Sequence, residues 1–463
     1  MLFSSLIFLS IFLPLVTAIY IIVKKELKNF VLLVSSLIFY AWGEPRYLAI
    51  MLFIIILNYT FGILVETAKN RKIYLFLAVV GNLSVLIYFK YFNFIIENLN
   101  NLLSSKISSI DIIMPIGISF YIFQALSYVI DVYRKGVKAQ KNIYNLALYV
   151  TFFPQLIAGP IVKYHDIEKE ITKRNMNFEN IYFGLKRFSF GLGKKIILAN
   201  TLGEVVDKIF NSNIDILDSK ILWLGAISYS LQLYFDFSGY SDMAIGLGKI
   251  FGFHFLENFN YPYISKSITE FWRRWHISLG SWFREYLYIP LGGNRKGTKR
   301  TYINLFLVFL ATGIWHGASW TFIIWGLWHG VFIITERYFS IEKYNKLYQR
   351  AIRYAYTVLV FIIGWVIFRA PTLRIGLKYL KIMFGLKKNS IIGYGIWYFL
   401  DNKILIILII GILASLSTFK FMFVEKKSLK YKISMEIFSL FVIIISMILI
   451  SSSTYNPFIY FRF

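Results

Sequence analysis

Cysteine is absent from this chain of 463 residues, and histidine occurs only five times. The lack of cysteine excludes disulfide bonds, thiolate metal sites and a cysteine nucleophile. Acidic residues are also scarce, because 24 aspartates and glutamates stand against 50 lysines and arginines, for a formal net charge of +26. Such an excess is typical of nucleic-acid-binding proteins. Here, however, the basic residues lie in short segments between apolar runs, which favours the positive-inside bias of a membrane protein.

Apolar and aromatic residues make up most of the chain. Hydrophobic residues account for 57% of it, and phenylalanine, tryptophan and tyrosine together for 19%, well above the usage of soluble domains. Several apolar runs approach or reach the ~20 residues that a helix needs to cross a bilayer; they cover residues 2–23, 47–65, 221–233, 302–315, 354–368, 404–416 and 437–450. The sequence therefore predicts an all-α polytopic membrane protein with roughly 11 transmembrane or re-entrant helices.

The positions of the lysines predict an orientation. Lys24, Lys25 and Lys28 follow the first apolar run, so this end of the run is expected in the cytoplasm and the N-terminus outside. Two further crossings then place the basic residues near position 70 in the cytoplasm, and another two crossings place those near position 135 there as well. Because the charges follow the run rather than precede it, we interpret residues 2–23 as a retained helix and not as a cleaved signal peptide.

The chain shows no long polar linker, so we predict a single membrane domain over residues 1–463. Within it we expect peripheral spans over 1–109, a catalytic core over 110–340 and C-terminal spans over 341–463. The core is interrupted by Pro115 with Gly117, and again by Phe152-Phe153-Pro154-Gln155 and Gly159-Pro160. Broken helices at membrane depth are tolerated where they are buried in protein or line a cavity, which predicts a cavity in this part of the chain.

Residues 265–300 carry eight basic residues against Glu270 and Glu285. Large side chains recur there at steps of three and four, namely Trp272, Trp275, Leu279, Trp282 and Tyr286. This spacing predicts one amphipathic helix lying in the membrane interface, ended by Pro290. Gly292-Gly293-Asn294 predicts a turn before the basic loop 295–300. That loop is suited either to phosphates of a nucleotide-bearing donor or to simple stop-transfer, and it lacks the spacing of a P-loop.

His316, in Gly313-Ile-Trp-His-Gly317, is the main candidate for chemistry. An ionisable side chain inside a membrane-length apolar segment is costly and usually functional. A neutral imidazole in an apolar site is able to serve as a general base toward a hydroxyl, and the flanking glycines permit close approach. His329 follows thirteen residues later. On an unbroken helix the two imidazoles would lie on roughly opposite faces, about 20 Å apart, so they are not expected to share a metal.

For the remaining candidates, a functional and a purely structural interpretation are both considered. His276 either contacts lipid headgroups or takes part in function, whereas His165 and His254 lie in loop-like polar surroundings that favour structural contacts. Asp236 and Asp242 follow an apolar run, and a buried acid there needs a partner, either structural or at a site. The serines around them do not form a Gly-x-Ser-x-Gly elbow. The aromatic C-terminus, 458–463, is typical of an interfacial anchor.

Five motifs, taken in order, resemble the membrane-bound O-acyltransferase (MBOAT) family, and more narrowly its bacterial alginate O-acetyltransferase branch. They are 115–121 (PIGISFY), 152–160 (FFPQLIAGP), 235–242 (FDFSGYSD), 271–279 (FWRRWHISL) and 313–317 (GIWHG). Residues 282–295 (WFREYLYIPLGGNR) are particularly specific to the branch. The resemblance extends from about residue 110 to the C-terminus.

This resemblance implies a fold of bent helices around a central tunnel in the cell membrane, and acetyl transfer from acetyl-CoA to an extracellular polysaccharide. His316 matches the family's catalytic histidine and His276 its second functional histidine. We expect substrate contacts from Arg273, Arg274, Asp236, Asn294, Arg295, Lys296, Trp315 and His329. No metal or bound cofactor is expected, and an exported serine-hydrolase-like acetyltransferase is expected as a partner.

The tail resembles the C-terminus of a small partner protein of the teichoic-acid D-alanylation system, in which a tyrosine is proposed to carry the acyl group. Tyr460 thereby becomes a candidate acyl carrier that needs a base such as His316, since a phenol has a pKa of about 10. D-alanyl transfer from a carrier protein to teichoic acid is the nearest rival function. A transporter would also account for the spans and the cavity, but not for the ordered motifs.

Overall fold

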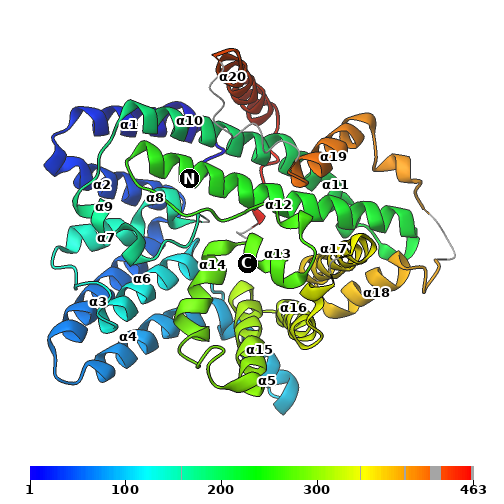
Figure 1. Cartoon of the computed structure of the whole chain (residues 1–463), viewed down its shortest axis with the longest axis horizontal. Coiled ribbons are helices and arrows are strands. Elements are labelled where there is room, and N and C mark those ends of the chain that lie inside the picture. The colour runs from blue at the N-terminus through cyan, green and yellow to red at the C-terminus, as the bar shows by residue number, and fades with distance from the viewer. Residues whose placement is uncertain (158, 345, 390–392, 418–428, 460–463) are drawn as a thin grey trace. The chain divides into compact units, whose positions relative to one another are not determined.

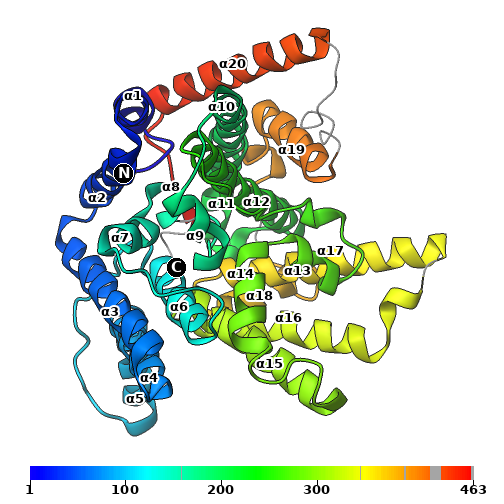
Figure 2. The same cartoon turned by 60° about the vertical axis from the view of Figure 1, so that its left-hand side comes forward.

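The computed structural model (Figures 1 and 2) describes residues 1–157, 159–344, 346–389, 393–417 and 429–459, and their regular secondary structure is all helical. This confirms the predicted all-α class. Four described helical segments are long and apolar enough to cross a membrane, 45–67, 71–103, 347–369 and 433–452, and shorter apolar helices occupy 8–22, 118–133 and 402–415. The protein is therefore a multi-pass membrane protein. The total of roughly 11 helices and the tunnel stay predictions.

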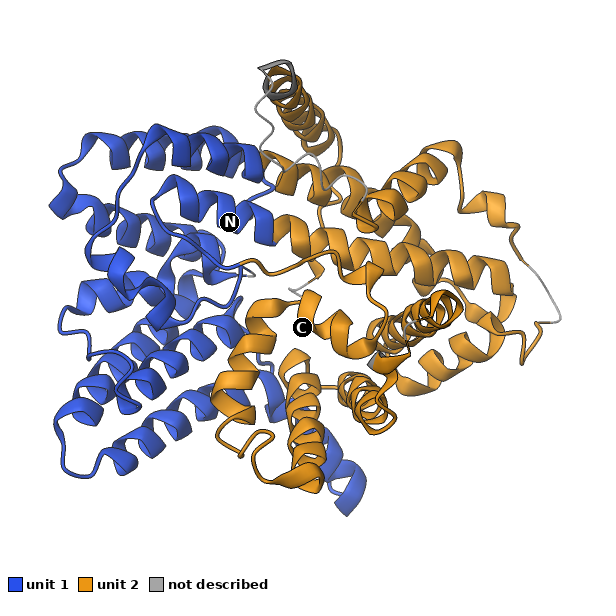
Figure 3. Cartoon of the chain, in the orientation of Figure 1, with its two compact units in different colours: residues 1–188, 241–256 blue, residues 189–240, 257–463 orange. Residues whose placement is uncertain are grey.

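Two compact units make up the chain (Figure 3). Unit 1 comprises residues 1–188 and 241–256, and unit 2 comprises residues 189–240 and 257–463. The units interleave along the sequence, because α10 (Phe178–Gly193) and α12 (Ser219–Ile250) each contribute residues to both. This division differs from the boundaries at 109 and 340 that the sequence suggested, and the single domain stays a prediction.

Unit 1 is built from α1 (Leu13–Ile22), α2 (Lys28–Ala41), α3 (Leu48–Thr67), α4 (Arg71–Leu86), α5 (Phe92–Leu103), α6 (Ile118–Tyr133), α7 (Ile143–Thr151), α8 (Phe153–Leu156) and α9 (Tyr164–Thr172). The predicted interruptions are present. Gly117 adopts a φ of +75° just before α6, and a Cβ there would lie 2.7 Å from the Leu156 carbonyl oxygen. Phe152 separates α7 from the single turn of α8. The chain thus breaks its helices where proline and glycine predicted.

Unit 2 contains the π-helical segment Lys194–Asn200 and most of α12. Its other helices are α11 (Thr201–Asn211), α13 (Ile268–Arg274), α14 (Ile277–Phe283), α15 (Gly297–His316), α16 (Trp320–Tyr338), α17 (Leu347–Arg369), α18 (Leu373–Met383), α19 (Asn402–Ser415) and α20 (Leu429–Ser452). Its buried core combines aliphatic side chains with a dense group of aromatic rings from α12, α13, α16 and α17. After α20 the chain leaves the helix and returns to this core, where Phe458 and Ile459 are buried.

The prediction of one interfacial helix over residues 265–290 was wrong. The segment forms two short helices, α13 and α14, which are separated at Trp275 and His276, and a π-helical turn follows at Arg284–Tyr288. His276 has a φ of +46°, a left-handed conformation that breaks a helix. The aromatic stripe faces the core rather than a bilayer surface, since Trp275 and Leu279 are each only 2% exposed. The turn at Gly292-Gly293 is confirmed, but α15 already begins at Gly297 within the predicted basic loop.

Candidate active site

Glycines pack α15 tightly against α16, side by side in Figure 2. A Cβ at Gly313 would lie 2.5 Å from the Phe322 carbonyl oxygen, and one at Gly326 would clash with the Phe309 carbonyl. With Gly330, four residues after Gly326, these positions form the small-residue contact that lets two apolar helices approach closely. The helix turns back at Gly317, and the Ser319 side chain caps the new N-terminus at the Thr321 N–H. His316 is thereby the last residue of α15, beside the start of α16.

The His316 side chain is buried among aromatic rings. It is 3% exposed, and its ring centroid lies 5.0 Å from Trp315, 4.9 Å from Trp325 and 5.4 Å from Phe368, each in an edge-to-face arrangement. Phe322 packs directly against Gly317, which follows His316 in the chain. His316 therefore sits in an apolar, aromatic environment, in which a neutral imidazole can serve as a general base toward a hydroxyl that reaches it.

His329 lies on the other side of the same tryptophan. Its ring is 5.3 Å from Trp325 and 5.2 Å from Trp272, and it stacks parallel to Phe271. Because the chain reverses at Gly317, both histidines contact one indole, and the unbroken helix on which a separation of about 20 Å depended is not formed. Neither ring nitrogen of His329 has a hydrogen-bond partner among the residues that the structure describes, although the side chain is fully buried.

His276 joins this group through Trp315. Its ring is 6.1 Å from Trp315 and 4.6 Å from Phe237, and it is 1% exposed, so it is not the headgroup contact that one interpretation offered. Its Nδ1 lies 3.1 Å from Asn258 Oδ1, which also accepts hydrogen bonds from the Ser278 N–H and Oγ. Since an amide oxygen only accepts, the Nδ1 of His276 carries the proton and Nε2 is the unprotonated nitrogen of the neutral ring.

Three histidines therefore lie in one aromatic cluster, in the order His276, Trp315, His316, Trp325 and His329. We call these five residues the histidine–tryptophan cluster. The sequence singled out all the histidines and Trp315, but not Trp325 or Asn258. Trp325 was visible only as an apolar residue of a helix, and Asn258 lies in a loop whose fold back onto His276 has no local signal.

The other predicted substrate-binding residues make different contacts. Arg274 forms an ion pair with Glu270 at 2.9 Å and donates to the Asn260 carbonyl. Asn294 is exposed and accepts hydrogen bonds from Tyr288 and Arg337. Arg273, Arg295 and Lys296 are exposed. Tyr460 is outside the described residues.

Asp236 is buried and paired. Its Oδ1 lies 2.7 Å from Lys195 Nζ, and its Oδ2 accepts a hydrogen bond from the Ile459 N–H at 3.0 Å. Both side chains of the ion pair are almost fully buried, at 1% and 2% exposed. Asp236 thus binds both Lys195 and the C-terminal segment. Neither partner was predicted from the sequence, because both are far from Asp236 along the chain.

A pocket of about 210 Å³ lies in unit 2 next to this segment. Its lining includes Phe322 and Phe368, Asp207 and Arg369, and Pro457 and Ile459 from the C-terminal segment. Phe368 and Phe322 also pack against His316 and Gly317, respectively. Asp207 and Arg369 form an ion pair at 2.8 Å. The pocket thus combines aromatic rings, one of them in contact with His316, with an ion pair and the C-terminal segment.

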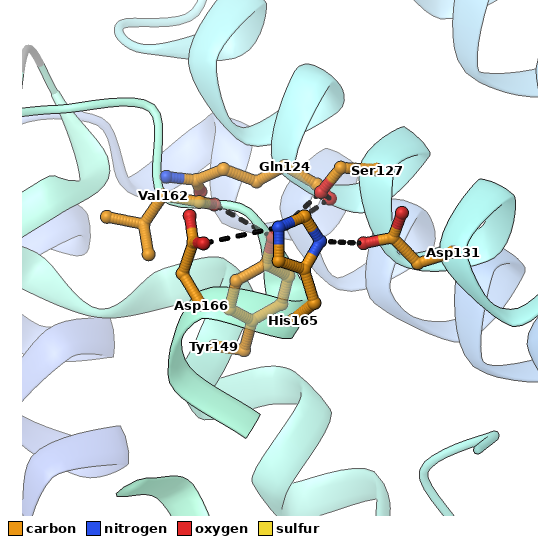
Figure 4. Close-up of polar contacts among 7 residues, drawn as sticks. All are labelled: Gln124, Ser127, Asp131, Tyr149, Val162, His165 and Asp166. Atoms are coloured by element: carbon orange, nitrogen blue, oxygen red, sulfur yellow. Dashed lines mark hydrogen bonds and ion pairs between the residues drawn. The ribbon is translucent and has the colours of Figure 1, made fainter. Parts of the chain in front are cut away.

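The remaining two histidines lie in unit 1 and make the structural contacts that their surroundings predicted. His165 stands between Asp131 and Asp166, at 2.8 and 3.2 Å (Figure 4). Hydrogen bonds to Asp131 and then to Asp166 raise the pKa of His165 to about 10. His254 contacts Glu170 at 2.7 Å. Across the described part of the chain, three or more histidine, aspartate or glutamate side chains nowhere gather closely enough to hold a metal ion.

A family model described as "MBOAT, membrane-bound O-acyltransferase family" matches residues 134–377, more than half of the chain. The chain belongs to the membrane-bound O-acyltransferase family. It is therefore an acyltransferase, and the histidine–tryptophan cluster and most of the pocket lining lie inside the matched range. Pro457 and Ile459 follow it.

Curated relatives cover most of the chain. It is 45% identical over 392 residues to a "Probable alginate O-acetylase AlgI" of Pseudomonas putida, a match that covers 83% of this chain and 80% of the relative. It is 37% identical over 428 residues to a "Peptidoglycan O-acetyltransferase" of Helicobacter pylori, covering 84% and 81%. A "Teichoic acid D-alanyltransferase" of Bacillus subtilis is 33% identical over 253 residues, covering 52% and 62%.

Proposed function

We propose that this enzyme takes acetyl from cytosolic acetyl-CoA and passes it across the membrane for O-acetylation of an extracellular or cell-wall polysaccharide. The observation that carries the proposal is the position of His316, whose ring packs against Phe368 in the lining of a small pocket. A pocket of about 210 Å³ is smaller than the ~300 Å³ and more of ordinary cofactor sites. It suits a two-carbon acyl group rather than a whole coenzyme.

His316 is proposed as the general base and Tyr460 as the acyl carrier. The imidazole takes the phenolic proton of Tyr460, and the phenolate oxygen attacks the thioester carbonyl. The C–S bond breaks, coenzyme A leaves as the thiolate and recovers the proton from the imidazolium, and an O-acetyl phenyl ester remains. What supports Tyr460 is its place in the chain, directly after Ile459, whose side chain lines the pocket.

The other predicted residues are assigned to the donor and to the next acceptor. Arg273, Arg274, Asn294, Arg295 and Lys296 supply charge and hydrogen bonds suited to the phosphates of coenzyme A, and His276 assists donor access. His329 and Trp315 complete the wall around the base, and Asp236 acts on the tail. An exported serine-hydrolase-like acetyltransferase is the proposed partner that collects the acetyl group from Tyr460 and transfers it to sugar.

The N-terminus is proposed to lie outside, as the positive-inside bias favours. The absence of cysteine makes this directly testable. Single cysteines introduced at Lys69 or Lys135 should react with a membrane-impermeant maleimide only after the cells are opened. Labelling in intact cells would contradict the orientation.

The acceptor has two candidates. The names of the Pseudomonas relatives favour an alginate-like exopolysaccharide, whereas the match to a peptidoglycan O-acetyltransferase covers slightly more residues and favours the cell wall. Acetyl analysis of both polymers from cells with and without the enzyme discriminates between them. D-alanyl transfer has less support, because that match covers only about half of the chain.

The test is mass spectrometry of the C-terminal peptide after the purified protein is incubated with isotopically labelled acetyl-CoA, with His316→Ala in parallel. Label on Tyr460 that disappears in the variant supports donor, base and carrier together. Consumption of acetyl-CoA that needs His316 but leaves the peptide unmodified would remove Tyr460 from the mechanism. No consumption at all would contradict the acetyl-CoA donor and favour a carrier-protein thioester.

A further inference from the structure

The C-terminal segment 453–459 is held in unit 2 by polar contacts that ordinary anchoring of an aromatic tail does not require. Lys195 Nζ donates a hydrogen bond to the Pro457 carbonyl, while Asp236 Oδ2 accepts one from the Ile459 N–H at 3.0 Å. The two side chains are also paired with each other at 2.7 Å. Each charge therefore faces both its counterion and the backbone of the tail, on either side of Phe458.

Burial makes this arrangement informative. Both side chains are more than nine-tenths buried, and a buried ion pair is often no more stabilising than apolar side chains of similar volume. A role in stability alone is therefore a weak reason to place a lysine and an aspartate in this core. Their hydrogen bonds to two alternate residues, Pro457 and Ile459, fix the register of the segment, which apolar contacts do poorly.

The local backbone is shaped for this contact. Lys195 lies in the π-helical segment Lys194–Asn200, an insertion type that is frequent at functional sites. On α12, a Cβ at Gly239 would lie 2.7 Å from the Gly191 carbonyl oxygen and 3.1 Å from the Lys195 nitrogen, so glycine is required for the approach. Earlier in the tail, Asn200 donates to the Asn456 side chain at 3.2 Å, and the Tyr455 hydroxyl donates to Asp207 at 2.8 Å.

We infer that Lys195 and Asp236 are positioning residues for acyl transfer: they set the register of the C-terminal segment so that its next residue is presented to the base. The inference rests on the proposed function in one respect, the acyl-carrying role of Tyr460. The seating itself is independent of that role. Phe458 is enclosed by Tyr240 at 4.7 Å and by the Lys195 ammonium at 5.8 Å, and Ile459 belongs to the same buried cluster as Trp325 and Trp365.

The experiment compares the full-length protein with Lys195→Met/Asp236→Leu, which removes both charges together and leaves no unpaired buried ion. The control is Lys378→Met/Asp215→Leu, which removes another lysine–aspartate pair of unit 2, at 2.5 Å but with both side chains partly exposed. Three quantities are measured: the Tm, hydrogen exchange of the peptide 453–459, and the kcat and KM for labelling of Tyr460 by acetyl-CoA. Lys195→Arg, which keeps the charge and donors, is the conservative variant.

The double variant is expected to keep its Tm and its KM for acetyl-CoA, to exchange the Ile459 amide about 10- to 100-fold faster, and to lose kcat by a similar factor. The control should match the wild type in all three, and Lys195→Arg should recover part of kcat. Unchanged exchange at Ile459 would overturn the seating. Faster exchange with unchanged kcat would overturn the positioning role. A wild-type protein that consumes acetyl-CoA without labelling Tyr460 would instead refute the carrier function, and with it the positioning role, whatever the exchange shows.

Discussion

The indole of Trp325 meets the imidazole of His316 edge to face at 4.9 Å and contacts His329 at 5.3 Å on another side. One tryptophan on α16 therefore defines the surroundings of both histidines. The contact exists because α15 ends at His316 and the chain reverses, so that the N-terminal half of α16 packs back against the end of α15.

Replacing His316 by glutamine is expected to lower kcat by about 10²- to 10⁴-fold, the usual contribution of a general base. The glutamine side chain keeps a polar group of similar size in the pocket wall, so the protein should still fold. The measurement is the rate of acetyl-CoA consumption in detergent or nanodiscs. His254→Gln, which removes a histidine from a partly exposed contact with Glu170 in unit 1, is the matched control. Equal losses in both variants would contradict a catalytic role for His316.

Much of this cluster was predictable, because its histidines are rare ionisable residues in apolar segments and stand in recognisable motifs. The helix breaks at Pro115–Gly117 and around Phe152 were also predictable, since proline and glycine act locally. The break between α13 and α14 was not. Trp275 and His276 fit a helical period, and the left-handed residue is explained by hydrogen bonds that His276, Ile277 and Ser278 donate to Asn258, a loop residue with no local signal. Lys195 was missed for the same reason, because its partners are Asp236 and a carbonyl more than 250 residues away.

Gly364 on α17 provides the space that His329 occupies. A Cβ at this position would lie 2.8 Å from His329 Nε2, too close for either group to stay in place. Gly364→Ala is therefore expected to cost about 1–3 kcal/mol of unfolding free energy through overpacking. Thermal unfolding in detergent measures it.

The control and a second variant make the Gly364 prediction specific. Gly395→Ala adds the same methyl group where nothing lies within 4 Å, and it should be neutral. In the background His329→Ala the Gly364→Ala substitution should also become nearly neutral, because the clashing ring is gone. A cost that persists without the ring would show that some other contact of α17 is responsible.

A pH dependence is expected from His165, whose pKa is raised to about 10 by its hydrogen bonds to Asp131 and Asp166. The unfolded chain has the ordinary value of about 6.5. Between these values the folded state binds the proton and the unfolded state does not, so this contribution is full below about pH 6.5 and is lost as the pH rises toward 10. His165→Gln should therefore lower the Tm more at pH 6 than at pH 10. The ring is 37% exposed, so the difference will be modest. A Tm difference between wild type and variant that is equal at both pH values would refute the ion pairs.

Asn258 is expected to act entirely through His276. Its Oδ1 holds the Nδ1–H of His276 at 3.1 Å and the Ser278 N–H at 3.2 Å. Asn258→Leu leaves the imidazole without the acceptor that selects its tautomer, so kcat/KM for acetyl-CoA should fall by about 10-fold or more. If that loss comes from His276, the double variant Asn258→Leu/His276→Ala will be no slower than His276→Ala alone, since residues acting as a unit are non-additive. Steady-state rates of the two single variants and the double variant decide it. Losses that multiply would mean that Asn258 serves the enzyme by a route other than the histidine, for example by holding the start of α14.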